Sequence, residues 1–472
     1  MIKRIYYLSA VLLLVMVFSC KKDHHKSKDY VYHKVIPAEF PQLNIPGFTF
    51  PEDSLVINKW VRSSEVNKIH LHGWGIWTGL TTETDQYIPG DKRPLRVFET
   101  WLTPEEMIDS IKGDPVQRSN RANLKTPNQF GHFALNQETI NDSIHESVSY
   151  SPAAASFAIN NKIFMATTLL GYSQAGKTEV PFFPSNAITI KPVFKVLAAS
   201  TGATSFNISA WHGPVNDTVA YPEQDWLTFV TVDTSKGAKS EGNTYSVDDF
   251  IHYKLNDEDA DYFNKEFTEN TGNEFNAQPG DYVILMAMHV GTREITNWTW
   301  QTFWWDSKPD NPPLPSSKEI ADARPDELKG AARNYAMAVA YYMINPDEPY
   351  NGVDIKGEPN YAYNPYLEAG FGPDVFDESL SYINTVQGEK IDTYAGVRTN
   401  CMSCHRMASV DPASGLNLGN PADNSKTPYV GNSYISRNDT IFQNQLKLDF
   451  AWSIQGNVDT TGLKAYLNKL DK

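Results

Sequence analysis

Residues 306–317 constrain the fold of this chain more than any other segment. Four prolines stand there among polar residues, at positions 309, 312, 313 and 315. Proline lacks an amide hydrogen and its ring clashes with the preceding turn, so neither a helix interior nor a central strand can run through the segment. We therefore predict a linker at 306–317 between two regions of different pattern.

The region before the linker, residues 36–305, is dominated by strand signals. β-branched and aromatic residues recur with partial alternation, which is typical of strands. Five stretches share this pattern: residues 187–197, 206–211, 226–232, 281–290 and 298–305. A short polar segment joins the last two, so we expect them to form a hairpin. Residues 64–80 and 151–159 have helical patterns. Residues 36–305 are thus predicted to be an α+β domain built on an antiparallel sheet.

The region after the linker, residues 318–472, has a helical pattern. Residues 321–344 contain a long run of small and apolar side chains, and residues 462–470 alternate apolar and polar positions at helical spacing. We expect a mostly helical domain here. The whole chain is therefore predicted to be of the α+β class, with a sheet-rich domain followed by a helical one.

A pair of cysteines followed directly by a histidine stands in the second region. Cys401 and Cys404 are three positions apart, and His405 comes next. Two thiols at this spacing can add to the two vinyl groups of one porphyrin, and the adjacent imidazole can then ligate the iron. A disulfide, a thioredoxin-like redox pair and half of a zinc site are the alternatives. Zinc needs four ligands, and the sequence has no second cysteine pair to complete them.

At these residues the chain resembles the c-type cytochromes. The resemblance implies that Cys401 and Cys404 anchor one covalent haem c by thioether bonds and that His405 is its proximal axial ligand. It also implies a cytochrome c-like fold for residues 318–472. The layout is similar to that of large single-haem envelope proteins, in which a mixed α/β region precedes the cytochrome segment. Residues 364–369 and 448–454 share this similarity.

The beginning of the chain has the pattern of an export signal. Lys3 and Arg4 precede an apolar run at 10–18 that is too short to span a bilayer. The run ends at Cys20 in what resembles a lipobox, so we predict a signal peptide at 1–19, acylation of Cys20 and a polar tether at 20–35. An ordinary signal peptide with a chance cysteine is the alternative. Lipid anchoring in the cell envelope, facing the periplasm or the cell surface, follows from this prediction.

The charge of the chain limits its partners. The formal net charge is −15, which argues against binding to nucleic acid, because such binding needs basic patches. A redox partner protein is expected instead.

The sixth ligand of the iron is not evident after the motif. His405 is the last histidine, and Met407, the last methionine, is too close to His405 to reach the opposite side of the iron. We consider three upstream candidates, Met337, Met343 and His289. Methionines in such positions commonly fill gaps in a core, and a histidine facing apolar neighbours is commonly a hydrogen-bonded core residue. The alternative is an open iron site.

Two other groups have both a functional and a structural interpretation. The aromatic cluster comprises Trp298, Trp300, Phe303, Trp304 and Trp305. On an exposed face it would stack on a sugar or another flat ligand, whereas in a sheet core it would only pack. His70 and His72 would bind metal together if they lay on a strand, but they diverge on a helix. We assign them no metal.

Three functions are compatible with these patterns. The first is electron transfer through one covalent haem in the cell envelope. The second is a haem-dependent oxidoreductase or a gas-binding sensor, whose open iron site binds peroxide, oxygen or nitric oxide. The third is a carbohydrate-binding lipoprotein with a structural haem, for which the aromatic cluster is the only support.

Overall fold

The computed structural model describes residues 34–118, 120–125, 144–215, 221–345, 358–370, 400–406, 408–410, 438 and 442–470. At positions 344, 345, 358, 359, 403, 404, 469 and 470 it describes the backbone but not the side chains.

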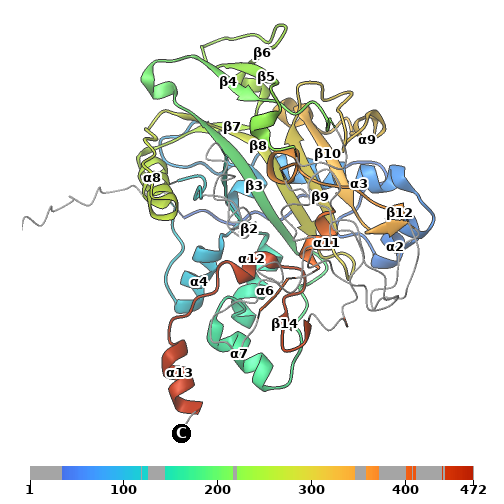
Figure 1. Ribbon diagram of the computed structural model, residues 1–472, viewed down its shortest axis with the longest axis vertical. Helices are drawn as coiled ribbons and strands as arrows, with labels where there is room; N and C mark the ends of the chain where they lie inside the picture. The colour runs from blue at the N-terminus through green and yellow to red at the C-terminus, as the bar shows by residue number, and fades with distance from the viewer. Residues whose placement is uncertain are drawn as a thin grey trace, which may run out of the picture.

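A seven-stranded antiparallel sheet forms the centre of the molecule (Figure 1). Its strands follow the order β1-β3-β8-β9-β10, with β2 also pairing with β3 and β7 with β8. Their bounds are β1 (His145–Glu146), β2 (Ser149–Tyr150), β3 (Ile188–Leu197), β7 (His252–Lys254), β8 (Tyr282–Thr292), β9 (Thr299–Trp305) and β10 (Tyr335–Ala340). The predicted antiparallel sheet and the β8–β9 hairpin are both confirmed.

Smaller strand groups lie outside this sheet. β4 (Ser205–Ser209), β5 (Phe229–Asp233) and β6 (Thr244–Ser246) form a three-stranded sheet beyond one end of the central strands (Figure 1). Two further pairs are β11 (Ile344–Asn345) with β12 (Glu358–Pro359), and β13 (Ser409–Val410) with β14 (Leu446–Lys447).

Helices surround the central sheet. The α-helices are α2 (Ser54–Arg62), α3 (Val66–Thr81), α4 (Pro104–Lys112), α6 (Pro152–Asn161), α7 (Ala166–Gln174), α8 (Asp257–Thr271), α9 (Lys318–Asp322), α10 (Pro365–Glu368), α11 (Cys401–His405), α12 (Trp452–Gln455) and α13 (Leu463–Leu470). Short 3-10 helices are η2 (Val97–Thr100), η4 (Ala199–Thr201), η5 (Glu223–Asp225), η6 (Val247–Asp249) and η7 (Gly330–Asn334). The helices predicted at 64–80, 151–159 and 462–470 correspond to α3, α6 and α13. Among the described residues, no helix is long and apolar enough to cross a membrane.

The helix α3 packs closely on one face of the sheet because glycines replace larger side chains on it. A Cβ added to Gly73 would lie 2.7 Å from the sulfur of Met337 and 3.2 Å from Val339, both on β10, so glycine allows this close approach to the sheet. Trp77 stacks on Phe303 of β9, with ring centroids 4.4 Å apart and an interplanar angle of 17°. Burial of such large aromatic rings is a major source of core stability.

The helix predicted within residues 321–344 is wrong for the most apolar part of that segment, which forms the strand β10. β10 pairs with β9 from the Tyr335–Trp305 pair to the Ala340–Trp300 pair. A short run of small and apolar residues fits a buried strand as well as a buried helix, and periodicity alone cannot separate the two. The described residues after the linker therefore add a strand to the sheet formed before it, in an α+β fold. The predicted division into two domains stays a prediction, since residues 346–357, 371–399 and 411–437 lie outside the described part.

Candidate functional site

The helix α11, which carries the cysteine–histidine motif, lies on the face of the central sheet opposite to α3. Phe303 of β9 faces α3, where it stacks on Trp77. Side chains along a strand alternate between faces, so Trp300, three residues earlier, points to the other side. His405 stacks on Trp300 there, with ring centroids 3.9 Å apart and an interplanar angle of 28°. The position of α11 beside β9 is visible in Figure 1. The sheet thus separates the motif from the α3 core.

The imidazole of His405 is held in one neutral form. Its Nδ1 lies 2.9 Å from the carbonyl oxygen of Phe450, and because a carbonyl only accepts, Nδ1 carries the hydrogen. Burial lowers the pKa of His405 to about 4; the hydrogen bond to Phe450 opposes this shift, and the charge of Lys191 adds to it. Near neutral pH the ring therefore presents an unprotonated Nε2, the form that binds metal ions.

The Phe450 carbonyl is presented by an unusual turn. Asp449 and Phe450 have φ values of 46° and 67°, in the left-handed region that non-glycine residues seldom adopt. The Asp449 carboxylate accepts hydrogen bonds from the Phe183 amide at 2.9 Å and from Nε of Arg293 at 3.0 Å. Burial raises the pKa of Asp449 to about 6, against the lowering effects of Arg293 and the Phe183 amide.

Cys401 begins α11 and is buried. Its thiol donates a hydrogen bond to the Ala362 carbonyl at 3.4 Å. The side chain of Asn400 accepts a hydrogen bond from the Met402 amide at 2.9 Å, which satisfies a donor at the start of the helix. Asn400 therefore caps the turn that holds the motif. The backbone of Cys404 belongs to α11, but its side chain lies outside the described part of the structure.

Three side chains with metal-ligating atoms meet beside the motif, from distant parts of the chain. The ligand atoms of His289 on β8, Glu368 at the end of α10 and Cys401 on α11 all lie within 4.8 Å of one another. Nε2 of His289 is 3.9 Å from Oε1 of Glu368. His289 is opposite Thr302 in the β8–β9 register, so it faces the side of the sheet on which α11 lies.

Burial shifts the proton affinities of this group in opposite directions. It raises the pKa of Glu368 to about 7, although the Asn364 amide and Lys191 lower it. It lowers the pKa of His289 well below its usual range, and the charges of Lys191 and His405 lower it further. A neutral imidazole therefore lies next to a carboxyl that exchanges its proton near neutral pH, a pairing suited to acid–base chemistry.

The three candidate distal ligands take different positions. His289 is brought to the motif. Met337 is on the opposite face of the sheet, where a Cβ added to Gly73 of α3 would lie 2.7 Å from its sulfur; this packing argues against the predicted role of Met337 as a ligand. Met343 is buried after β10, and its carbonyl accepts a hydrogen bond from the Asn360 amide at 2.8 Å. A role for Met343 as a ligand stays a prediction.

Sequence reasoning did not identify Glu368 as a site residue. The sequence does indicate the beginning of a short helix at Asn364-Pro365, the start of α10, and Glu368 lies in the same turn. The Asn364 side chain also donates to Oγ1 of Thr302 at 2.8 Å and to the Phe303 carbonyl at 3.1 Å. These bonds dock α10 on β9 and thereby bring Glu368 to His289, a contact that sequence spacing cannot reveal.

The aromatic cluster of the hairpin is part of the core. Its five members are 3% exposed or less: Trp298, Trp300, Phe303, Trp304 and Trp305. The interpretation as sheet core is confirmed, and an exposed stacking platform for sugars is not formed by these residues. The carbohydrate-binding hypothesis thereby loses its only support.

His70 and His72 both lie on α3. His72 is buried and bonded on both ring nitrogens, to the hydroxyl of Tyr341 at 2.6 Å and to Oε1 of Glu294 at 3.1 Å. Burial lowers the pKa of His70, while Glu319 raises it. The helix separates the two rings as expected for these positions.

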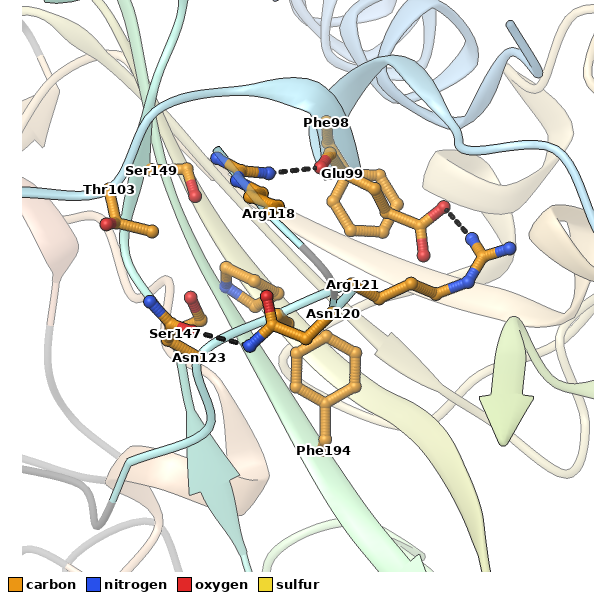
Figure 2. Close-up of a pocket in the computed structure, with 12 residues that line it drawn as sticks. Phe98, Glu99, Thr103, Arg118, Asn120, Arg121, Asn123, Ser147, Ser149 and Phe194 are labelled. Atoms are coloured by element: carbon orange, nitrogen blue, oxygen red, sulfur yellow. Dashed lines mark hydrogen bonds and ion pairs between the residues drawn. The ribbon is translucent and has the colours of Figure 1, made fainter. Parts of the chain in front are cut away.

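A small pocket that opens to solvent, shown in Figure 2, lies apart from the motif. Two buried arginines stand in its wall. Arg118 pairs with Glu106, and Arg121 pairs with Asp91 at 2.7 Å and Glu99 at 2.8 Å. The other lining residues are Phe98, Thr103, Asn120, Ala122, Asn123, Ser147, Ser149, Pro192 and Phe194. Carboxylates already pair with both guanidinium groups, which disfavours the binding of a further anion in this pocket.

The predicted signal peptide, Cys20 and most of the tether lie outside the described residues, as does Met407. No protein-family model, curated protein or solved structure matches this chain. The functional argument therefore rests on the residues around α11.

Proposed function

We propose that this chain carries one haem c, bound covalently through Cys401 and Cys404 with His405 as axial ligand, and transfers electrons in the cell envelope. One observation carries the proposal. The His405 ring is half-buried and neutral, and it donates its Nδ1–H to the Phe450 carbonyl, which leaves Nε2 to bind a metal ion. Ligating histidines commonly donate their other ring nitrogen to a carbonyl or carboxylate in this way.

The other residues of α11 fit the same group. Cys401 places a buried thiol one turn from His405, and the cap by Asn400 holds the beginning of that turn. Trp300 and Trp452 border the His405 ring, with centroid distances of 3.9 and 6.1 Å. The haem would supply one-electron chemistry, while these residues bind it, orient the imidazole and exclude water. The solvent exposure and the neighbouring side chains of a haem are among the means by which proteins set its potential.

His289 is the best-supported candidate for the sixth ligand. It is on the same face of the sheet as α11, and its pKa is low enough that the ring is neutral. Ligation by His289 would favour electron transfer, because the iron would have no open position. The large sheet region would then both supply this ligand and dock a redox partner protein.

The second candidate function is a haem enzyme or gas-binding sensor with an open iron site. Glu368 favours it specifically. Catalysis beside an iron needs a group that gives and takes protons near neutral pH, and Glu368, with a pKa of about 7, lies against His289 near Cys401.

Absorption spectra of the purified protein, ferric and ferrous, with and without carbon monoxide, test the proposal. Low-spin bands that carbon monoxide leaves unchanged would support electron transfer, whereas a shift on carbon monoxide would favour the open site. The Cys401→Ser, Cys404→Ser variant is expected to lose covalent haem, seen as loss of haem stain on a denaturing gel. Ser403→Ala, which keeps both thiols and the histidine, is the matched control. A stained double variant would refute covalent attachment.

We propose in addition that Cys20 carries a lipid and anchors the protein in the envelope. The lipobox-like end of the leader supports this. A Cys20→Ser variant is expected to leave the membrane fraction, and continued anchoring would contradict the proposal.

A further inference from the structure

We infer that Arg293 and Asp449 are positioning residues for His405: their ion pair holds the turn that presents the Phe450 carbonyl to His405 Nδ1, and so sets the electron density of the iron-binding imidazole. The inference rests on the proposed function, in which His405 is the axial ligand. It concerns residues that the sequence motif does not contain.

The turn at Asp449 and Phe450 needs something to hold it. Left-handed backbone is strained for a non-glycine residue, and these are the only two consecutive residues with such φ values among the described non-glycine positions. Strain of this kind persists only where the surroundings enforce it, and it concentrates at functional sites. Because of the turn, the Phe450 carbonyl accepts from both His405 Nδ1 and the Trp452 amide, at 2.9 and 3.0 Å.

The Asp449 carboxylate supplies that enforcement through two donors. Its side chain is only 1% exposed. Oδ2 accepts from the Phe183 amide at 2.9 Å and from Nε of Arg293 at 3.0 Å. Arg293 is fixed in turn, since its Nη1 donates to the Ile295 carbonyl and its amide to the Ala187 carbonyl, at 2.9 and 3.0 Å. A buried ion pair with these extra hydrogen bonds has one geometry, and breaking it is costly.

The ion pair also links the histidine to the sheet. Arg293 directly follows β8, the strand that carries His289, and lies in the connection to β9, which carries Trp300. The β8–β9 hairpin therefore holds His405 in two ways, by stacking of Trp300 on the ring and by the ion pair behind the Phe450 carbonyl. A firmly held acceptor makes the imidazole a stronger donor to the iron and stabilises its ferric state. A loosened acceptor should raise the reduction potential.

Three variants separate positioning from simple charge effects. Arg293→Lys keeps the charge, but a single ammonium group cannot serve Asp449 and Ile295 together in the manner of the guanidinium fork. Asp449→Asn keeps an acceptor for the Phe183 amide and tolerates the left-handed backbone. Arg293→Gln removes the positive charge. Positioning predicts that all three keep their haem and that the potential rises in each, by about the equivalent of a tenfold change in the reduction equilibrium, or 59 mV.

A pure charge effect predicts a different pattern. Removing the carboxylate would raise the potential, removing the guanidinium would lower it, and Arg293→Lys would leave it unchanged; this pattern would overturn the inference. The matched control is Asp91→Asn, which breaks the Arg121–Asp91 pair. Arg121 lies beside β7, with its guanidinium 5.8 Å from the ring centroid of Tyr253, and the potential of this variant should stay unchanged.

Redox titration of the full chain, together with its visible spectrum and haem stain, gives all the readouts. Absence of haem from the unmodified protein would refute the proposed function. Haem with an unchanged potential in all three variants would refute only the positioning role. If Asp449→Asn or Arg293→Gln does not fold, Arg293→Lys still decides, because it conserves the charge of the pair.

Discussion

Glu368 and His289 show how burial acts on single residues at this site. Burial disfavours the charged form of any group, so it raises the pKa of Glu368 and lowers that of His289. The folded-state pKa of Glu368, about 7, lies above its ordinary value of 4.5. A carboxyl whose pKa is higher in the folded state than in the unfolded state contributes stability. That contribution is fully present below the pKa of the unfolded state, and it is lost as the pH rises through the pKa of the folded state.

We therefore expect Glu368→Gln to remove a pH-dependent loss of stability. As the pH rises to 8, the unmodified protein should lose up to about 3.5 kcal/mol of stability relative to the variant, the product of the pKa shift and about 1.4 kcal/mol per unit. Urea unfolding at pH 5 and pH 8 measures the difference. Glu274→Gln, at an exposed position, is the control and should follow the unmodified protein. Parallel pH profiles for Glu368→Gln and the unmodified protein would contradict the assigned shift.

At the scale of elements, the β8–β9 hairpin positions Trp300 by leaving room on the neighbouring strand. Gly291 lies opposite Trp300 in the hairpin register, and a Cβ added there would be 2.7 Å from the indole ring. The ring that stacks on His405 therefore depends on a missing side chain one strand away. Overpacking at such a site forces side chains out of place.

Gly291→Ala is expected to displace Trp300 and to lower the free energy of unfolding by about 1–3 kcal/mol. Replacing Trp300 by leucine in the same chain should relieve the clash, so the two changes should couple favourably in a double-mutant cycle. Gly456→Ala is the control, because an added Cβ there meets open space. Additive effects of Gly291→Ala and Trp300→Leu would show that the ring is not held by this contact.

At the scale of the whole molecule, the segments before and after the linker share a core. β10 completes the hydrogen bonds of β9. The indole nitrogens of Trp74 and Trp77, both on α3, donate to the carbonyls of Ile320 and Ala332 at 2.7 and 2.9 Å. A chain that ended at the linker would leave both indoles without these acceptors and would expose one edge of β9.

We predict that residues 34–317 do not fold independently. Unpaired strand edges and buried unsatisfied donors are costly, so the fragment should lack a cooperative thermal transition in circular dichroism, while residues 34–472 should show one. A chain cut within 306–317 after folding should remain associated on gel filtration. Cooperative unfolding of the isolated fragment would instead support two independent domains.

Local features of this fold could be predicted from the sequence. The β8–β9 hairpin and helix α3 were recognisable because their patterns are long and their side chains alternate at the spacing of each structure. β10 was not, since a short run of small apolar residues suits either structure until it meets a partner strand. Its pairing with β9 depends on residues 30 positions away, as the Tyr335–Trp305 pair shows.

The candidate site likewise has one part that the sequence predicts and another that depends on the tertiary structure. The sequence by itself determined that Cys401, Cys404 and His405 stand within one turn, because covalent spacing alone sets their proximity. Only the tertiary structure decided that His289 and Glu368 meet Cys401, and that the Phe450 carbonyl holds His405. The reason is physical: those contacts join segments far apart in the chain, and their geometry depends on how the sheet, α10 and the turn at Asp449 pack together.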